Sequence, residues 1–396
     1  MKEGLLAPDH PHTPHTSYMP TYLESNNKPE GTMAPEITED NVTVDTGEAF
    51  YNPHMRIDRE ITIASLAAFN ETIDRIESYV DSFAATGIRG LRAASKLGIS
   101  VTLNDIDPDV SSLIRRNIVS NDLQSHCEAA NENANTLLNR RRFDAVDLDP
   151  FGSPAPYLAA ASHSVRKMLL VTATDTAPLC GAHLKSGIRK YACVPINNEY
   201  HAEIGVRVLL GSIARALAVV DGATIPLLAY ARRHYVRVYV RVLKRVSSAD
   251  DSMKKLGFIV HCPQCSFRRP IAGLAPLISG ECPICGSRMQ AAGPLWIGHL
   301  HDYAFSKSVL SELNEKGSDK HAIKLVEMCR DEIDAPTFYD YHRICHTIGI
   351  SPIPIDLAVD KLRNAGFEVS RTHFSGTALK TDADIHAIIK VLSDGA

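Results

Sequence analysis

Two carboxylates, a proline and an aromatic ring stand together at residues 147–152, which read D-L-D-P-F-G. The preceding residues 144–148 have the pattern of a buried strand, so we expect Asp149 at the carboxyl end of that strand. A carboxylate there can accept hydrogen bonds from the exocyclic amine of a nucleobase and hold its lone pair in line with a methyl donor. Pro150 has no N–H and fixes a turn that can aim a carbonyl group inward, and Phe151 offers a face on which a base can stack. The motif therefore predicts methyl transfer to the amine of a base.

The same six residues have a simpler alternative interpretation. An Asp-Pro turn could merely end the strand, with Phe151 tucked into the core. Asp147 points to the opposite face from Asp149 only if the strand continues that far, so the role of Asp147 stays open. The simpler interpretation loses weight because a glycine-rich turn and a second acidic residue occur at the ends of neighbouring predicted strands.

That glycine-rich turn, A-T-G-I-R-G at residues 85–90, follows a predicted strand at 78–83. It fits neither the G-x-G-x-x-G dinucleotide motif nor the P-loop. Asp105 ends the next predicted strand, where its carboxylate can accept hydrogen bonds from both ribose hydroxyls of an adenosine ligand. A turn that brings the backbone close without a phosphate cradle suits S-adenosylmethionine better than NAD or ATP. Tight packing of a helix on a strand is the alternative explanation of the glycines.

Two C-x-x-C pairs, Cys262/Cys265 and Cys282/Cys285, are separated by sixteen residues. Each pair has proline after its first cysteine, and Gly286 follows the second pair. This spacing predicts a tetrahedral Zn²⁺ site, which we expect to be structural because four thiolates leave no position for water. A redox dithiol is the alternative. The other five cysteines lack such spacing and are expected to be ordinary buried or half-buried residues.

Residues 232–245, R-R-H-Y-V-R-V-Y-V-R-V-L-K-R, are basic and contain no acid. In a strand, alternation places Tyr235, Arg237, Tyr239 and Arg241 on one face and valines on the other. Arginines interleaved with tyrosines suit contacts with phosphates and stacked bases. A plain solvated sheet face is the alternative.

The pattern of strands and helices indicates the scaffold that positions these residues. The expected strands are 78–83, 100–103, 144–148 and 169–174, and the helices between them include 61–76 and 110–120. Such alternation indicates βαβ units and a parallel sheet, at whose carboxyl strand ends ligands bind. Asp81, Asp105 and Asp149 all stand at such ends.

Length and composition set further bounds. The 396 residues allow two or three domains, and the net charge of -4 requires any nucleic-acid contact to come from a local patch. No apolar run approaches a membrane span and no secretory signal is present, so we expect a cytoplasmic protein without membrane contact. Residues 1–35 are expected to form a disordered leader, although its closely spaced histidines could bind a metal.

Several long strings of the chain occur in the same order in one enzyme family. They are F-Y-N-P-H-M-R-I-D-R-E at 50–60, A-T-G-I-R-G-L-R at 85–92, N-D-I at 104–106, D-L-D-P-F-G-S-P at 147–154, T-A-T-D-T-A-P-L-C-G at 172–181 and R-T-H-F-S at 371–375. On these strings the sequence resembles the tRNA (guanine-N2)-dimethyltransferases, which modify guanosine 26 of tRNA. The resemblance implies transfer of one or two methyl groups from S-adenosylmethionine to the N2 amine. It also implies a Rossmann-like class I methyltransferase domain at 36–240 and a C-terminal α+β domain at 241–396, which binds tRNA and carries the zinc ribbon.

The resemblance also assigns site residues. Asp149, Pro150 and Phe151 match the catalytic motif, and Phe50 is the candidate for the second face of a base sandwich. The cofactor contacts of the family correspond to Arg59, Arg89, Asp105, Asn133 and Ala134. An acid is more usual than asparagine at position 133, which leaves the adenine contact open, with Glu132 as a substitute. Because some members lack the four cysteines, zinc is expected to support the structure or tRNA docking and not the chemistry.

Two other functions remain as alternatives. An adenine-N6 methyltransferase also favours an acid or amide, then proline, then an aromatic residue. The other alternative is a non-catalytic zinc-ribbon RNA-binding protein with an inactive methyltransferase fold. Digestion of the methylated product to nucleosides distinguishes methylation of adenine from methylation of guanine. Asp149→Ala distinguishes an enzyme, which should lose most of its rate, from a non-catalytic protein, in which nothing measurable should change.

Overall fold

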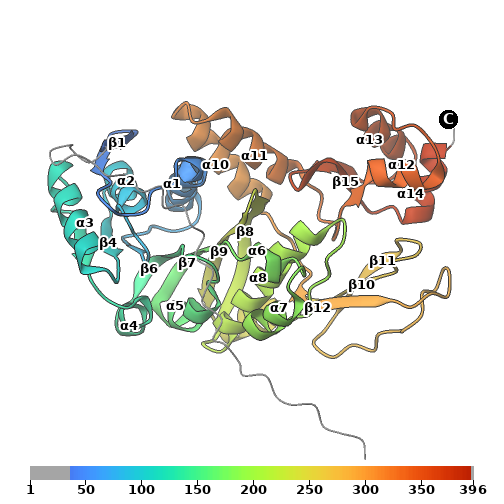
Figure 1. The fold of residues 1–396 in the computed structure, drawn as a ribbon, viewed down its shortest axis with the longest axis horizontal. Helices are drawn as coiled ribbons and strands as arrows, with labels where there is room; N and C mark the ends of the chain where they lie inside the picture. The colour runs from blue at the N-terminus through green and yellow to red at the C-terminus, as the bar shows by residue number, and fades with distance from the viewer. Residues whose placement is uncertain (1–35, 394–396) are drawn as a thin grey trace, which may run out of the picture. The chain divides into compact units, whose positions relative to one another are not determined.

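The computed structural model describes residues 36–393, and the leader predicted at 1–35 lies outside the described residues. The strands of the central sheet are β3 (Ser78–Asp81), β4 (Ser100–Asn104), β5 (Cys127–Ala130), β6 (Phe143–Leu148), β7 (Val165–Ala173), β8 (Gly222–Arg232) and β9 (Tyr235–Lys244). In the described chain they lie in the order β5-β4-β3-β6-β7-β9-β8 (Figure 1). Strands β3 to β7 are parallel, whereas β9 is antiparallel to both of its neighbours. The mostly parallel sheet confirms the expected α/β fold.

Helices cover both faces of this sheet because its strands are apolar on both sides. The helices that precede or connect these strands are α1 (Arg56–Thr72), α2 (Ile88–Leu97), α3 (Pro108–Ser120), α4 (Ala134–Arg140), α5 (Leu158–Ser164), α6 (Thr176–Leu179), α7 (Leu184–Tyr191) and α8 (His201–Ala218). Adjacent strand residues join different apolar cores: Val146 packs with residues of α5 and α8, whereas Ala145 packs with residues of α1 and α2. The central sheet is therefore held between two cores.

Some element boundaries differ from the predicted ones. The helix expected at 61–76 is α1, which begins earlier, at Arg56. A short 3-10 turn, Pro53–Met55, leads directly into it, and the side chain of Asn52 caps this turn by accepting the N–H of His54. The predicted strand at 78–83 ends at Asp81, because the chain then turns away from the sheet.

The carboxyl ends of β3 and β6 form the switch point of the sheet. From β3 the chain proceeds to β4 on one side, while β6 pairs with β3 on the other side. In open α/β sheets the connections leave a crevice at such a point, and ligands bind there. Both the glycine-rich turn and the DPFG turn (residues 149–152) begin at this edge.

The prediction for the basic strand was wrong in one respect. Tyr235, Arg237 and Tyr239 do share a face of β9, but all three are buried instead of exposed to phosphates. Strand β9 lies inside the sheet, between β7 and β8, and α1 covers this face, where Thr62 Oγ1 lies 3.0 Å from Tyr239 Oη. Alternation identified the shared face, but it could not show that a helix covers it.

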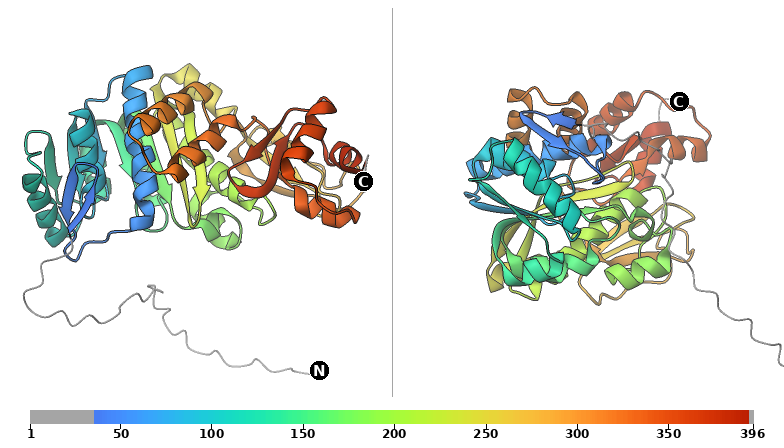
Figure 2. Two further views of the ribbon diagram at one scale, coloured as in Figure 1. Left: turned by 90° about the horizontal axis from the view of Figure 1, so that it is seen from above. Right: turned by 60° about the vertical axis from the view of Figure 1, so that its left-hand side comes forward.

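The other elements flank this sheet. They are β1 (Glu36–Glu39), β2 (Val42–Asp45), α9 (Val246–Met253), β10 (Leu256–His261), β11 (Arg268–Ala272), β12 (Gln290–Trp296), α10 (Tyr303–Glu315), α11 (Lys320–Asp331), β13 (Tyr339–Asp340), α12 (Tyr341–Ile348), α13 (Ile355–Asn364), β14 (Val369–Thr372), β15 (Ser375–Thr381) and α14 (Ile385–Ser393). Helix α10 packs along α1 (Figure 2), and its residue Val309 joins the same apolar core as Leu66. Helix α13 and strand β14 form a helix-turn-strand unit near the C-terminal end of the described residues. The division at 240/241 stays a prediction.

Two histidines close the outer edge of the central sheet. His301 Nδ1 accepts the N–H of Ala229 at 3.5 Å, and His373 Nε2 accepts the N–H of Ala231 at 3.3 Å. Both backbone groups belong to the edge strand β8, where unpaired N–H groups are otherwise open to pairing with another chain. The two rings lie close to Cys329, and their other nitrogens face Glu332: His301 Nε2 lies 3.5 Å from Oε2, and His373 Nδ1 lies 2.5 Å from Oε1. We therefore assign these rings to edge protection.

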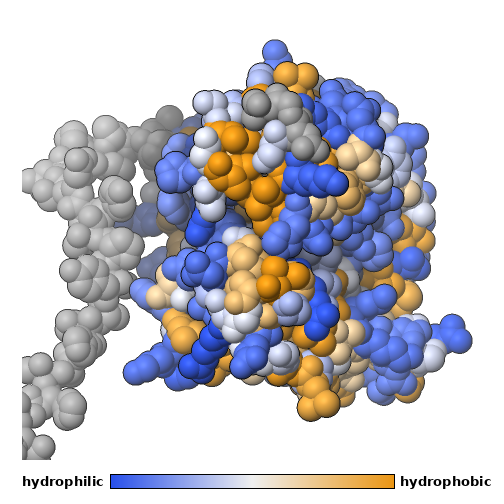
Figure 3. Space-filling model, turned by 90° about the vertical axis from the view of Figure 1, so that its right-hand side faces the viewer, coloured by the Kyte–Doolittle hydropathy of each residue, from blue (hydrophilic) through white to orange (hydrophobic). Residues whose placement is uncertain are grey.

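The face that carries the C-terminal elements has apolar side chains in small groups separated by polar ones (Figure 3). Exposed large apolar residues in this part of the chain include Leu277, Ile284 and Leu357. Among residues 36–393, no helix combines the length and the apolar character that a membrane span requires.

Candidate active site

Asp149 lies just beyond the end of β6, where it is paired with Arg89 of α2. A nitrogen of Arg89, Nη2, donates to Asp149 Oδ2, while Nη1 donates to Asp58 Oδ2 of α1 at 2.9 Å. The Asp149 side chain keeps 21% of its surface exposed, whereas Arg89 is 7% exposed and Asp58 is fully buried. The pairing holds the Asp149 carboxylate at the edge of the protein interior, where a substrate can still reach it.

A second guanidinium group holds the neighbouring carboxylate. Arg237 donates from Nη1 to Asp147 Oδ1 at 2.7 Å and from Nη2 to Asp147 Oδ2 at 2.8 Å. It also donates to the hydroxyls of Thr172 at 2.8 Å and Thr62 at 3.1 Å. Because both side chains are fully buried, this bidentate pair fixes the end of β6, and it gives Asp147 the structural role that the sequence left open.

Two tyrosines complete the buried network. Tyr79 donates its hydroxyl to Asp147 Oδ2 at 3.0 Å, and Tyr230 donates its hydroxyl to Asp58 Oδ1 at 2.8 Å. Burial alone would raise the pKa of Asp147, but Arg237 and Arg89 outweigh it and hold that pKa below its usual value. From the sequence, Arg237 was expected to contact phosphates and not Asp147, and Tyr230 was not indicated at all, although Asp58 stood in the D-R-E string.

In contrast to Asp147, the carboxyl group of Asp149 has a pKa above its usual value. Burial raises the pKa of its carboxyl group, and the nearby charges of Asp58 and Asp147 add to that rise. Arg89 and Arg237 oppose it without cancelling it. A carboxyl group whose pKa is raised is a better proton acceptor when ionised than an ordinary surface aspartate.

Phe50 contacts Phe151, which follows Asp149 by two residues, in an edge-to-face arrangement. Their ring centroids are 4.7 Å apart with an interplanar angle of 81°, and the two residues are 54% and 77% exposed. The DPFG turn is fixed behind them, since Gly152 N donates to Thr174 Oγ1 at 2.7 Å and Thr174 N donates to Gly152 O at 3.0 Å. Stacking a base between two parallel rings requires roughly 7 Å between their planes. The edge-on pair must therefore part and turn before a base can lie between the rings.

In the glycine-rich turn, two glycines allow a backbone conformation and a close packing that other residues would not. Gly87 has φ +82°, which favours glycine, while a Cβ on Gly90 would lie 2.5 Å from Leu103, so Gly90 serves the close packing of α2 on β4. The Asp105 carboxylate accepts the N–H groups of Ala85 at 3.3 Å and of Asp107 at 3.0 Å. Each carboxylate oxygen keeps a further lone pair, so these residues fit an adenosine-bearing ligand such as S-adenosylmethionine.

The other predicted cofactor residues have hydrogen-bond partners outside the group around Asp149. Arg59 is buried and binds Glu39, with a further contact to Asn52 O at 3.3 Å. Asn133 caps α4 by accepting the N–H of Asn135 at 2.9 Å, and Ala134, which follows it, is buried. Their contacts with a cofactor stay predictions.

Glu132, the expected substitute for an acid at 133, pairs instead with Arg140. Its backbone N–H donates to Asn104 Oδ1 at 3.1 Å, which ties this loop to the end of β4. The side chain is therefore directed to α4 by an ion pair in this structure.

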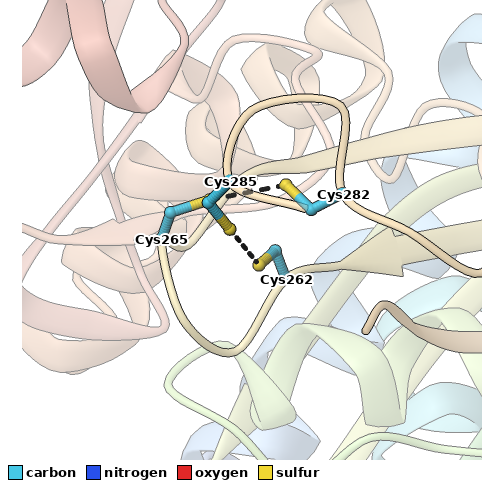
Figure 4. Close-up of side chains that lie close together, drawn as sticks. All are labelled: Cys262, Cys265, Cys282 and Cys285. Carbon is cyan, nitrogen blue, oxygen red and sulfur yellow. Dashed lines mark hydrogen bonds between the residues drawn. The ribbon is translucent and has the colours of Figure 1, made fainter. Parts of the chain in front are cut away.

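The four paired cysteines come together at the ends of β10, β11 and β12 (Figure 4). Cys262 Sγ lies 3.5 Å from Cys285 Sγ, and Cys265 Sγ lies 3.6 Å from Cys282 Sγ. All four sulfurs lie within 4.8 Å of one another. Tetrahedral Zn²⁺ with ordinary Zn–S bonds places its sulfurs about 3.8 Å apart, so the donor set fits a zinc ion.

The two knuckles repeat one backbone geometry. Cys262 N donates to Phe267 O and Cys282 N donates to Ser287 O, both at 2.8 Å. The residue after each second cysteine has a positive φ, +60° at Ser266 and +72° at Gly286. The repeated turn aims the two cysteines of each pair toward one point, as a closed metal site requires.

A large cavity of about 670 Å³ lies elsewhere in the molecule. Its wall includes Ala223 and Pro226 of β8 and Leu243 of β9, which stand at the end of the hairpin away from the DPFG turn, since Val236 pairs with Ala173 at the other end. The cavity is therefore separate from the group around Asp149.

Comparisons with known proteins agree with this geometry. A family model described as "N2,N2-dimethylguanosine tRNA methyltransferase" matches residues 31–393. A protein of Methanosarcina barkeri named tRNA (guanine(26)-N(2))-dimethyltransferase is 50% identical over 356 residues, which cover 87% of this chain and 92% of that protein. A protein of Haloarcula marismortui with the same name is 40% identical and is covered over 99% of its length, with 92% of this chain matched.

A solved structure resembles the fold as well. It is described as a complex of Trm1 from Pyrococcus horikoshii with S-adenosyl-L-methionine, and it is 33% identical to this chain with a TM-score of 0.82. The match covers 90% of this chain and 99% of the other. With the switch-point site and the four-cysteine cluster in place, these matches lead to one conclusion: the chain belongs to the N2,N2-dimethylguanosine tRNA methyltransferase family.

Proposed function

We infer that the protein transfers one or two methyl groups from S-adenosylmethionine to the exocyclic N2 amine of guanosine 26 in tRNA. The observation that carries this function is the Asp149 carboxylate, which is held by Arg89 in a turn whose Phe151 ring is exposed and contacts the exposed ring of Phe50. The family match over residues 31–393 supports the choice of guanine and of tRNA. A cytoplasmic location is part of the proposal because tRNA is the substrate.

In this function the Asp149 carboxylate accepts the N–H bonds of the amine and takes its proton when the N–C bond forms. Pro150 fixes the turn, and Phe151 with Phe50 holds the base after it leaves its stack. The bound cofactor supplies the methyl group on a sulfonium. Asp105 and the turn at 85–90 would hold its adenosine part. Arg59, Arg89, Asn133 and Ala134 are further proposed contacts.

The experiment that tests the function is methylation of unmodified tRNA transcripts, with the products digested and resolved as nucleosides. We expect N2-methylguanosine and N2,N2-dimethylguanosine, and we expect both to disappear when guanosine 26 is changed to adenosine. N6-methyladenosine as the product would support the adenine-specific alternative. Tight tRNA binding with no methylated product would support the non-catalytic alternative.

We predict that Phe50→Ala raises the KM for tRNA about 5- to 160-fold, because base–aromatic stacking contributes roughly 1–3 kcal/mol. The affinity for S-adenosylmethionine should stay within twofold of the wild-type value, since the ring lies with Phe151 and not at the glycine-rich turn. Steady-state kinetics with tRNA varied at saturating cofactor measure the effect. Phe50→Tyr is the matched control, because it keeps the stacking face. An unchanged KM for Phe50→Ala would contradict the base sandwich.

The four-cysteine cluster is proposed to hold structural zinc, as a zinc ribbon within a tRNA-binding domain at 241–396. We predict about one zinc ion per purified chain and almost none in Cys282→Ser, as measured by inductively coupled plasma mass spectrometry. The variant should also melt at a lower temperature. Cys127→Ser, which changes a buried cysteine of β5, is the control and should keep its zinc. Zinc retained by Cys282→Ser would exclude this site.

A further inference from the structure

The network around Asp149 carries more negative than positive groups. In the part of the chain that the structure describes, it contains four carboxyl groups and two guanidinium groups. Its carboxyl groups are Asp58, Asp81, Asp147 and Asp149, and its guanidinium groups are Arg89 and Arg237. With every group ionised, two negative charges would stay uncompensated in the protein interior. Burial of unpaired charge is strongly unfavourable, and a group in that position usually takes up a proton instead.

Asp81 is the member of the network that lacks a strong partner. It lies beside Asp147 on the neighbouring strand, in register, and is only 2% exposed. Its Oδ1 atom has no hydrogen-bond partner, whereas the other three carboxylates each accept from a guanidinium group. Asp81 is therefore the carboxyl group best placed to hold a proton.

The groups around Asp81 come from every element packed against it. Those that act on it directly are Tyr79 on its own strand, Arg89 of α2, Asp147 of β6, Asp149 just beyond β6, and the backbone of Phe83, which favours the ionised form. Asp58 of α1, Tyr230 of β8, and Arg237 and Tyr239 of β9 are linked to these groups by hydrogen bonds. Burial raises the pKa of Asp81 to about 7, Arg89 opposes the rise, and Asp147 and Asp149 add to it. With Asp81 neutral, one uncompensated negative charge is left at the switch point of the sheet.

The one uncompensated negative charge of the network is complementary to the net positive charge of S-adenosylmethionine. S-adenosylmethionine carries a sulfonium, an ammonium and a carboxylate, so it brings one net positive charge. The product S-adenosylhomocysteine carries no net charge, because its sulfur is a neutral thioether. A cationic ligand near Asp81 stabilises the ionised form of its carboxyl group, and a neutral one does not.

We propose that Asp81 is the proton store of the site: it releases a proton when the cationic cofactor binds, and it takes up the proton that Asp149 removes from the base amine. In the transfer the C–S bond breaks, the N–C bond forms and the sulfonium becomes a thioether. The amine proton passes to Asp149 and from there to Asp81. The buried network loses one positive charge with the sulfonium and gains one with the proton, so its total charge stays constant. Asp81 does not touch the base; it acts through Asp149 by holding the proton that keeps the total charge of the network constant. This role rests on the proposed function.

The direction of the pH dependence follows from linkage. Below about pH 7 Asp81 is protonated in the free protein, so binding of S-adenosylmethionine must displace a proton, and the affinity falls as the pH falls. Above that pH the group is already ionised and the affinity no longer changes. Between pH 8 and pH 6 the affinity should fall about tenfold. S-adenosylhomocysteine should show a much smaller change.

Isothermal titration calorimetry of the full chain, without tRNA, tests the proposal. At pH 6, titration in two buffers of different ionisation enthalpy should show release of most of one proton per S-adenosylmethionine bound, and of far less for S-adenosylhomocysteine. Asp81→Asn should release almost none and should bind with an affinity that is flat between pH 6 and pH 8. Asp109→Asn, an exposed carboxylate in the first turn of α3, is the matched control and should behave as the wild type does.

Equal proton release with the two ligands by the wild-type protein would overturn the proposal, and this result does not require any variant to fold. Undiminished proton release by Asp81→Asn would also overturn it. Because tRNA is absent, the outcome is independent of the RNA substrate. Proton release that depends on Asp81, together with failure to methylate guanosine 26, would support the proton store and count against the proposed function alone.

Discussion

Asp149→Ala is expected to lower the rate of methyl transfer about 10³-fold, within the range typical for loss of a positioned acid–base group. The substitution removes the acceptor that orients the amine and receives its proton. It should not unfold the protein, because Arg89 keeps its bond to Asp58 at 2.9 Å and lies 3.6 Å from Asp147. Single-turnover rates at saturating tRNA and cofactor measure the effect.

Binding measurements separate this loss from a structural one. The affinities for tRNA and for S-adenosylmethionine should stay within a few-fold of the wild-type values, and the circular dichroism spectrum should not change. Asp175→Ala is a useful control, since Asp175 follows β7 at the same edge of the sheet but binds Lys190 and Tyr191. A single-turnover rate of Asp149→Ala within threefold of the wild-type rate would show that the DPFG turn is not catalytic.

Arg237→Met is expected to lower the free energy of unfolding by about 3–5 kcal/mol, because it leaves the buried Asp147 carboxylate without its main partner. Both side chains of this ion pair are fully buried, so water cannot replace the lost bonds. Urea denaturation at pH 7, followed by circular dichroism, measures the change.

Two further variants make this prediction sharper. Arg241→Met, on the same strand but half-buried, should change the free energy of unfolding by less than about 1 kcal/mol. Asp147→Leu combined with Arg237→Met should recover much of the lost stability, since an apolar pair can replace a buried ion pair of similar volume. Arg237→Met with wild-type stability would mean that Asp147 takes up a proton or finds another donor at little cost.

The parts of the site that depend on local residue types could be predicted from the sequence. The DPFG turn, the glycine-rich turn and the acid at the end of β4 each follow a strand directly, so strand pattern and residue type place them at one edge of the sheet. The four cysteines were predicted from their spacing, and their sulfurs do come together.

The buried network could not be predicted in the same way. Arg237 reaches Asp147 across 90 residues and Tyr230 reaches Asp58 across 172, and no local pattern links positions so far apart. The error at β9 has a related cause. Alternation of arginine, tyrosine and valine identifies faces of a strand, but the exposure of a face depends on which helix packs there, here α1.

The histidines that cap β8 have a consequence for how the chain must fold. His301 and His373 follow the catalytic sheet in the sequence by many residues, so during synthesis the sheet forms with its outer strand still bare. Until both rings bind Ala229 and Ala231, a second nascent chain could add a strand there and begin an aggregate. We therefore expect the C-terminal part to protect this edge against aggregation, and a chain cut after β9 should precipitate where the full chain stays dispersed.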